Sequence, residues 1–156
     1  PDAHLLASDF CPEMLAHAKE RGVRETHVVD AMNMPFEDDS CDVLTVAFGL
    51  RNMADYPAAL SEMRRVIRAG GHLLVLDFST PEGALQRPYG FYLNKVLPKI
   101  AGVLTGQEEA YSYLAGSIGD FPSGAAMVEL IKGQGYKDVQ RIALSGGIAS
   151  IYTGSV

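Results

Sequence analysis

Short apolar runs rich in β-branched residues alternate with segments whose apolar residues recur at helical spacing, and this alternation constrains the fold more than any other feature. The expected strands are residues 4–8, 26–29, 42–47 and 72–78, and the first expected helix is residues 12–21. A second helix is expected to start at Pro57, with Asp55 as its cap, and to stop at Gly70 and Gly71. Its apolar face would consist of Leu60, Met63, Val66 and Ile67. The run DVLTVA is apolar on both faces, which is typical of a strand between two layers of helices. This order predicts right-handed βαβ units and a parallel sheet with helices on both faces.

The second half of the chain follows a different pattern. Residues 85–104 form an aromatic-rich stretch that is expected to be largely helical, and a further helix is expected from a Ser123 cap to Gly135. Residues 138–144 and 148–153 flank a Ser-Gly-Gly turn, which predicts an antiparallel hairpin. The sequence therefore predicts a single α/β domain over residues 1–156 that ends in an antiparallel hairpin.

The charge balance excludes several classes of function. The chain has 13 Lys and Arg against 19 Asp and Glu and no basic block, so we do not expect it to bind nucleic acid. Cys11 and Cys41 lie in no CxxC or Cys/His spacing, which predicts neither a metal site nor a disulfide framework. No signal peptide and no long uninterrupted apolar run is visible, so a cytoplasmic location is expected.

Polar residues follow three of the expected strands directly, and ligands of open α/β sheets bind at the carboxyl ends of strands. Asp9 ends the first strand, where a carboxylate can accept both hydroxyls of a ribose; on spacing alone, a solvated acid near a helix N-terminus is the more frequent case. Asp30, with Ala31 and Met32, follows the next strand. It can bind an adenine amino group, or it can simply form a turn.

The third position is the segment Phe48-Gly49-Leu50-Arg51-Asn52, directly after residues 42–47. A glycine lets the backbone approach a ligand closely. An Arg-Asn pair at the mouth of an apolar cleft is costly unless it is solvated or has a partner. An ordinary surface loop remains the alternative.

Four segments carry a resemblance to a known family: MPFEDDSCDVLTVAFGLRNM, RRVIRAGGHLLVLDFS, AYSYLAGSIGDFP and SGGIASIYTG. In this order the chain resembles the ubiquinone/menaquinone biosynthesis C-methyltransferases, a class I S-adenosylmethionine-dependent family, and FGLRN is the most specific segment. The resemblance implies a Rossmann-like sheet, S-adenosyl-L-methionine as the methyl donor, and a prenylated quinol (demethylmenaquinol or a ubiquinol precursor) as the acceptor.

The resemblance also implies a role for individual residues. The implied cofactor-binding residues are Asp9, which would hold the ribose hydroxyls, Phe10, Asp30, Ala31, Met32, Phe48 and Gly49; the implied catalytic residues are Arg51 and Asn52; the implied substrate residues are Arg51, Tyr89, Tyr111 and Tyr113. A positive Arg51 can stabilise the phenolate that develops on the quinol, directly or through an ordered water that takes the proton.

Residues 85–121 are expected to form a lid or substrate-pocket insertion, because the family's acceptor carries a polyprenyl tail. The apolar residues available for it are Leu85, Tyr89, Phe91, Tyr92, Leu93, Val96, Leu97, Ile100 and Leu104. Packing onto the sheet and a homo-oligomer interface are the alternatives. Contact with the inner face of the membrane is a further expectation.

The sequence departs from the family pattern in two places. Gly116 stands where the family signature YLxESI has a glutamate, and no G-x-G-x-G occurs in the chain. By resemblance, a central strand between residues 4–8 and 42–47 is also absent, so two sheet pieces with unpaired inner edges are expected. Either the chain is part of a longer one, or another chain supplies the missing strand. Two other functions stay open: methylation of another small acceptor, and a non-catalytic assembly module.

Overall fold

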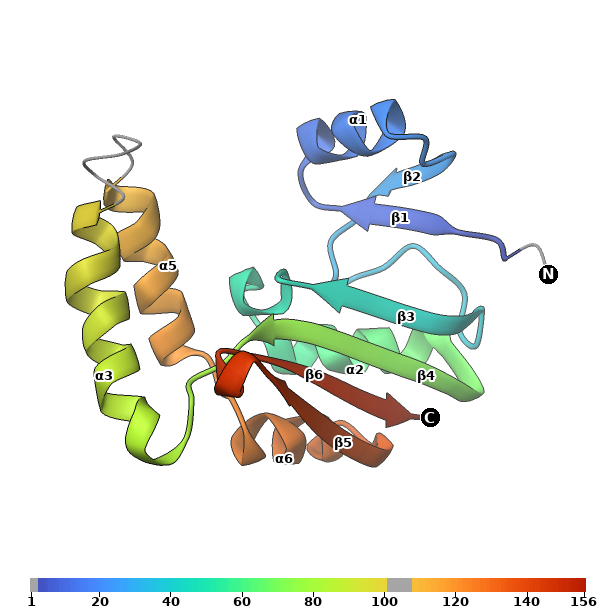
Figure 1. Ribbon diagram of the computed structural model, residues 1–156. Coiled ribbons are helices and arrows are strands. Elements are labelled where there is room, and N and C mark those ends of the chain that lie inside the picture. The colour runs from blue at the N-terminus through green and yellow to red at the C-terminus, as the bar shows by residue number, and fades with distance from the viewer. Residues whose placement is uncertain (1–2, 101–107) are drawn as a thin grey trace.

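The computed structural model describes residues 3–100 and 108–156, which form a small unit with a two-stranded parallel sheet, a larger unit with a four-stranded mixed sheet, and a separate helical hairpin (Figure 1). The elements are β1 (Leu6–Asp9), α1 (Pro12–Glu20), β2 (Glu25–Val28), β3 (Cys41–Ala47), η1 (Leu50–Asn52), α2 (Tyr56–Val66), β4 (Ile67–Phe78), η2 (Gly83–Leu85), α3 (Gln86–Phe91), the π-helix η3 (Tyr92–Val96), α5 (Glu108–Asp120), α6 (Ala125–Gly133), β5 (Lys137–Leu144), η4 (Ser145–Gly147) and β6 (Ala149–Ser155).

The strands form two sheets. β1 pairs with β2 in parallel, and the second sheet has the order β3-β4-β6-β5, in which β3 and β4 are parallel and β6 is antiparallel to both β4 and β5. The predicted parallel strands and the C-terminal antiparallel hairpin are therefore confirmed. Among residues 3–100 and 108–156 no strand pairs between β1 and β3, as the sequence predicted.

The parallel strands place their carboxyl ends on one side of the molecule. In Figure 1 the arrowheads of β1, β3 and β4 point the same way, toward the hairpin of α3 and α5. The segments that follow these strands therefore face the hairpin, which is the side where ligands of such sheets bind.

The main core lies between the four-stranded sheet and the helices α2 and α6. α2 begins as predicted, because the Asp55 carboxylate accepts a hydrogen bond from the backbone N–H of Ala58 at 2.9 Å. Its buried face contributes Leu60 and Met63, and the sheet contributes residues such as Tyr152. At the start of β4, a Cβ on Gly71 would lie 2.7 Å from the Asp42 carbonyl oxygen, so only glycine permits this close approach.

Three local predictions were wrong. Gly70 and Gly71 do not stop α2, because they lie inside β4. Ile67 is not on the helix face, because α2 ends at Val66 and Ile67 opens β4, where it pairs with Cys41 and is fully buried. Ser123 does not cap α6: Gly124, at φ 63°, is the capping residue, and the Ser123 hydroxyl instead accepts from the Thr80 N–H at 3.4 Å.

The predicted helical stretch 85–104 is helical as far as residue 100, and Leu104 lies outside the described residues. It is interrupted by η3 and packs against α5 through its own small core (Leu93, Ala115 and Ile118, with Phe78, Tyr89, Leu97 and Leu114 around them). The hairpin therefore has a core distinct from that of the sheet.

Candidate functional site

The ends of β1 and β2 bring Asp9 and Asp30 into neighbouring turns. Asp9 is the last residue of β1, is paired with Val28, and accepts the Val29 N–H on its carbonyl oxygen at 3.0 Å. Each carboxylate is oriented by its own turn: Asp9 Oδ1 accepts from the Cys11 N–H at 2.8 Å, and Asp30 Oδ1 accepts from the Met32 N–H at 2.9 Å. Within the described parts of the chain, Oδ2 of neither carboxylate has a hydrogen-bond partner.

The neighbours of these acids differ in exposure. Phe10 is 76 % exposed, whereas Ala31 and Met32 are half-buried and pack against the main core. A hollow of about 500 Å³ lies between β1 and α1, and Asp9 is the one expected site residue that lines it.

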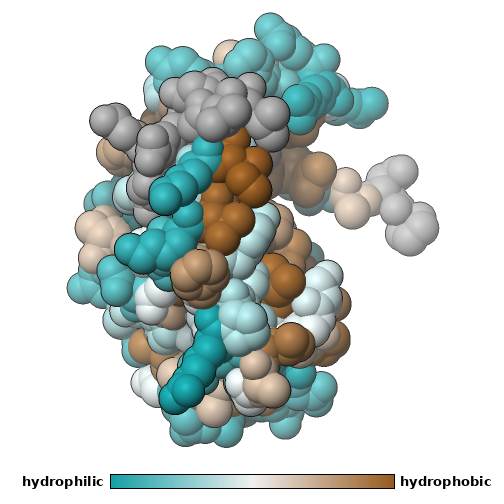
Figure 2. Space-filling model, turned by 60° about the vertical axis from the view of Figure 1, so that its left-hand side comes forward, coloured by the Kyte–Doolittle hydropathy of each residue, from teal (hydrophilic) through white to brown (hydrophobic). Residues whose placement is uncertain are grey.

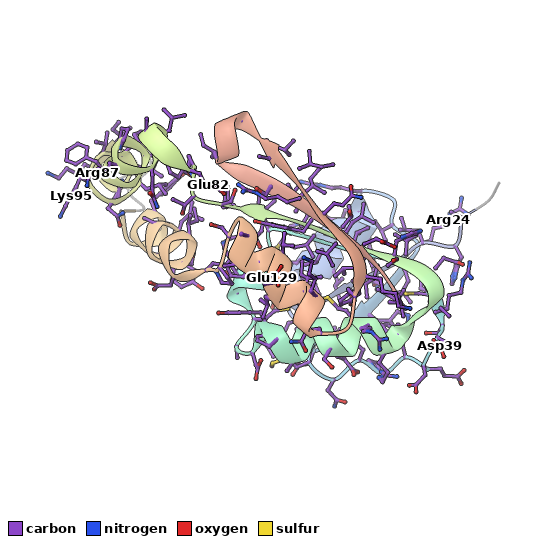
Figure 3. All side chains as sticks on the ribbon, turned by 90° about the horizontal axis from the view of Figure 1, so that it is seen from below. Arg24, Asp39, Glu82, Arg87, Lys95 and Glu129 are labelled. Atoms are coloured by element: carbon purple, nitrogen blue, oxygen red, sulfur yellow. The ribbon has the colours of Figure 1, made fainter. Side chains whose placement is uncertain are left out.

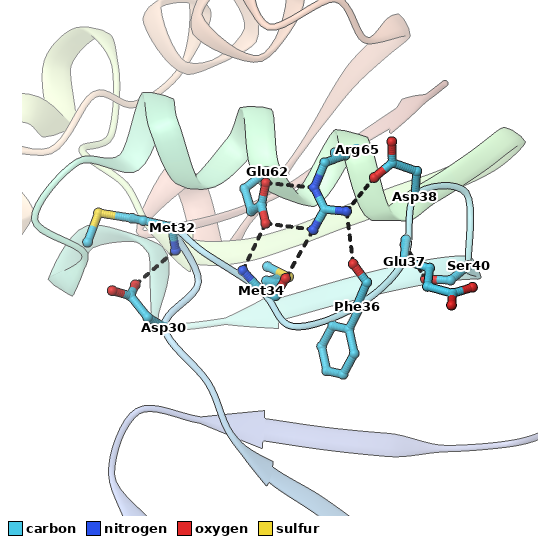
Figure 4. Close-up of polar contacts among 9 residues, drawn as sticks. All are labelled: Asp30, Met32, Met34, Phe36, Glu37, Asp38, Ser40, Glu62 and Arg65. Atoms are coloured by element: carbon cyan, nitrogen blue, oxygen red, sulfur yellow. Dashed lines mark hydrogen bonds and ion pairs between the residues drawn. The ribbon is translucent and has the colours of Figure 1, made fainter.

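The segment that follows Asp30 is anchored to α2 by an arginine that sequence reasoning missed (Figure 4). Arg65 binds both oxygens of Glu62 at 2.7 and 2.9 Å, and it donates to the carbonyl oxygens of Met34 and Phe36 and to Asp38. Glu62 also accepts the Met34 N–H at 2.8 Å. The hydrogen bonds from Arg65 hold the pKa of Glu62 below its ordinary value. This network fixes the path of the loop that carries the expected adenine contacts.

The segment after β3 is a tightly bonded turn rather than a solvated loop. Phe48 has φ 55°, an unusual conformation for a residue other than glycine, and its N–H bonds the Leu76 carbonyl oxygen at 2.8 Å. The side chain of Arg51 folds back onto this turn, and its Nη1 donates a hydrogen bond to the Phe48 carbonyl oxygen at 2.7 Å. Leu50 is fully buried below it.

Arg51 forms an ion pair that the sequence reasoning did not anticipate. Its Nη1 lies 2.8 Å from Oδ1 of Asp77, a residue of β4 with no exposed surface, and the Arg51 side chain itself is only 10 % exposed. The guanidinium carbon is 5.2 Å from the centre of the Phe78 ring. The centres of the Phe78 and Phe48 rings are 4.8 Å apart. The signal that was available is the acid inside the otherwise apolar run HLLVLDF.

Of the expected substrate residues, one reaches this turn. The Tyr113 hydroxyl donates to Oδ1 of Asn52 at 3.3 Å, and Asn52 Nδ2 lies 3.4 Å from the Phe48 carbonyl oxygen. Tyr89 packs in the hairpin core, where burial, and then the neighbouring Tyr92, raise its pKa. Tyr111 is half-buried on α5.

The expected site residues thus fall into two groups. Asp9 and Asp30, with their neighbours, lie at or just after the ends of β1 and β2, and Phe48, Gly49, Arg51 and Asn52 lie just after the end of β3. No hydrogen bond between these two groups is present in the described residues. The described residues contain no cluster of three or more His, Cys, Asp or Glu side chains suited to a metal ion. None of the helices in residues 3–100 and 108–156 has the length and apolar character that a membrane span requires.

The fold has close counterparts among solved structures. A SAM-dependent methyltransferase from Thermotoga maritima aligns with 95 % of this chain and 71 % of its own length, at a TM-score of 0.68 and 20 % identity. At that identity the similarity shows the class I methyltransferase fold alone.

Sequence relatives are much nearer. The chain is 44 % identical to a ubiquinone/menaquinone biosynthesis C-methyltransferase UbiE of Bdellovibrio bacteriovorus and 43 % identical to a demethylmenaquinone methyltransferase of Mycobacterium marinum. The alignments cover 96 % and 97 % of this chain but 66 % of each relative. The chain therefore spans a little under two thirds of the length of these relatives. Residues 2–156 match the ubiE/COQ5 methyltransferase family, and the chain belongs to that family.

Proposed function

We propose that this chain forms the larger part of an S-adenosylmethionine-dependent C-methyltransferase that methylates a prenylated quinol in quinone biosynthesis. The observation that carries the proposal is the turn after β3, in which the buried guanidinium of Arg51 is paired with Asp77 and lies over the Phe78 ring, while the Asn52 amide donates to the Phe48 carbonyl oxygen. Family membership and the relatives' names support the reaction class.

The residues present fit the adenosyl half of the donor. Asp9 ends β1 and Asp30 lies two residues after the end of the neighbouring parallel strand β2, and each keeps one carboxylate oxygen without a partner in the described residues. Asp9 would hold the ribose hydroxyls, Asp30 the adenine amino group, and Met32 would pack against the ring. When bound, S-adenosylmethionine supplies a methyl group activated by its sulfonium sulfur.

On the acceptor side, the protein has to make a ring carbon nucleophilic. That carbon would become electron-rich when the adjacent quinol hydroxyl loses its proton. It would then form the new carbon–carbon bond as the methyl–sulfur bond breaks, with S-adenosylhomocysteine as the leaving group, and would release its own proton to restore the aromatic ring. Arg51 would stabilise the developing phenolate, directly or through an ordered water. Asn52 would orient the ring, because its amide donates to the Phe48 carbonyl oxygen and accepts from the Tyr113 hydroxyl.

The helical hairpin would hold the substrate's prenyl tail and contact a lipid surface. Residues 83–107 contain Arg87, Lys95 and Lys99 and no acid, in a chain whose net charge is −6. Figure 3 shows Arg87 and Lys95 projecting from the hairpin, away from the sheets. Phe91 beside them is 66 % exposed, and Figure 2 shows apolar surface next to hydrophilic surface over the hairpin. Exposed aromatic and cationic side chains on one helix suit an anionic membrane surface.

The test is a methyl-transfer assay on the full-length protein. Methyl-labelled S-adenosylmethionine is supplied with demethylmenaquinol or with a prenylated benzoquinol, each in anionic or neutral vesicles, and with soluble phenols as controls. We expect label on a ring carbon of one quinol, at a higher rate in anionic vesicles. Label on a soluble phenol alone would favour another acceptor, and no transfer to any acceptor would favour an assembly role. If the rates are equal in the two kinds of vesicle and the protein is a dimer whose interface contains Phe91, the hairpin surface is a homo-oligomer interface and not a membrane contact.

A further inference from the structure

We propose that Asp77 is a positioning residue for the methyl transfer: it holds the Arg51 guanidinium so that Nε–H is presented to the ring oxygen of the quinol. The inference rests on the function proposed above and deepens it, because it assigns a role to a residue that neither the sequence pattern nor the expected site included.

The first support is the set of bonds to the Asp77 carboxylate. Oδ1 accepts from Arg51 Nη1 at 2.8 Å and from the Phe78 N–H at 2.8 Å, while Oδ2 lies 3.4 Å from the Arg51 N–H. The carboxylate thus contacts both the side chain and the backbone of the same arginine. Asp77 is fully buried in β4. β4 pairs with β3, and the turn follows β3 directly.

The second support is the way in which the arginine uses its donors. Nη1 makes two bonds, to Asp77 and to the Phe48 carbonyl oxygen. Nε is buried and has no hydrogen-bond partner in the described part of the chain. A buried donor without a partner is unfavourable, and a water or a ligand oxygen is its usual complement. A quinol oxygen would satisfy it.

The third support is electrostatic. A buried carboxylate is tolerated when it is paired and hydrogen-bonded. The ion pair of Asp77 comes from Arg51 in this turn, and β4 itself adds one hydrogen bond from the Phe78 N–H. A neutral buried pair attracts a phenolate less than a free arginine would, so the benefit of Asp77 lies in orientation. Small displacements of a group at the reacting centre cost large factors in rate.

The test uses variants of the full-length protein. In Asp77→Asn we expect kcat to fall by about 10- to 100-fold, with the Kd for S-adenosylhomocysteine and the KM for the quinol within about threefold. If Asp77 acts through Arg51, the same substitution in an Arg51→Ala background changes kcat by less than about twofold. Asp42→Asn is the matched control, because it removes the acid of an Asp–Arg pair (Arg68) at the opposite end of β3. It should leave kcat unchanged.

A spectroscopic measurement separates this inference from the proposed function, because it does not depend on methyl transfer. The Nε–H proton of Arg51 should be protected from solvent exchange in the wild-type protein and should shift when the quinol binds. In Asp77→Asn its exchange should be at least tenfold faster. If the wild type transfers no methyl group, the proposed function fails, and the exchange rate alone decides whether Asp77 positions Arg51. Unchanged exchange, or multiplicative losses of kcat in the double variant, would overturn the inference.

Discussion

The Tyr113 hydroxyl of α5 donates a hydrogen bond to Oδ1 of Asn52 in the turn after β3, over 3.3 Å. This contact joins the helical hairpin to the ends of the strands, although the hairpin has a separate core. Because Tyr113 is 64 % exposed, the bond contributes little to stability and is free to break and form. It is therefore suited to coupling the position of the hairpin to the position of Asn52.

Removal of this hydroxyl should impair catalysis without unfolding the protein. In Tyr113→Phe we expect kcat/KM for the quinol to fall by about 3- to 10-fold, since one neutral hydrogen bond is worth about 1 kcal/mol. The Kd for S-adenosylhomocysteine and the melting temperature should stay at their wild-type values. An unchanged kcat/KM would show that the contact has no part in the reaction.

Asp9 should determine the affinity for the donor. The carboxylate is expected to accept the ribose hydroxyls, and hydrogen bonds to a charged group contribute about 1.5–3 kcal/mol. Asp9→Ala should therefore raise the Kd for S-adenosylhomocysteine by about 10- to 100-fold in calorimetry. Asp138→Ala, a change of an acid near the start of β5, serves as the control and should leave the Kd unaltered. Equal Kd values for Asp9→Ala and the wild type would remove Asp9 from the donor site.

The Glu62–Arg65 network should make stability depend on pH in the acid range. Hydrogen bonds from Arg65 lower the pKa of Glu62 in the folded protein, so the folded state favours the carboxylate. This stabilisation is fully present above the ordinary glutamate pKa of about 4.3 and is lost as the pH falls through the lowered pKa.

Urea unfolding at two pH values checks this. Glu62→Gln should lower the free energy of unfolding by about 1–2 kcal/mol at pH 7, and the difference from wild type should nearly vanish at about pH 3. Glu129→Gln is the matched control, because Glu129 forms an exposed pair with Lys132 at the same i, i+3 spacing; its effect should stay below about 0.5 kcal/mol. A Glu62→Gln effect that is the same at both pH values would contradict the assignment.

The separation of β1 from β3 should limit the stability of residues 1–156 on their own. Each of these strands has an edge without a partner in the described residues, and apolar side chains such as Leu5 and Val43 are more than half exposed. We expect the free energy of unfolding of this polypeptide alone to lie below the usual range of about 5–15 kcal/mol, and we expect the polypeptide to self-associate. Rapid amide exchange in β1 and β3 would accompany this. A monomer with a free energy of unfolding above about 5 kcal/mol would contradict the prediction.

Periodicity was sufficient to predict most of the fold, because buried strands and amphipathic helices leave their spacing in the sequence. It placed Asp9 at the end of a strand, where the structure has it, and Asp30 directly after a strand, whereas the structure has it two residues beyond the end of β2. It failed at Ile67, since a buried apolar residue after a helix can belong to either element. It also missed Asp77, because the partner of this acid is Arg51, 26 residues away, and only the parallel pairing of β3 with β4 brings the two together.

The measurement that tests the central claim most directly is a crystal structure of the full-length protein with S-adenosylhomocysteine. We predict that the ribose hydroxyls lie within hydrogen-bond distance of the Asp9 carboxylate, that the adenine lies beside Asp30 and Met32, and that the sulfur faces the turn containing Arg51 and Asn52. A ribose bound away from Asp9, or a sulfur turned away from Arg51, would contradict the account.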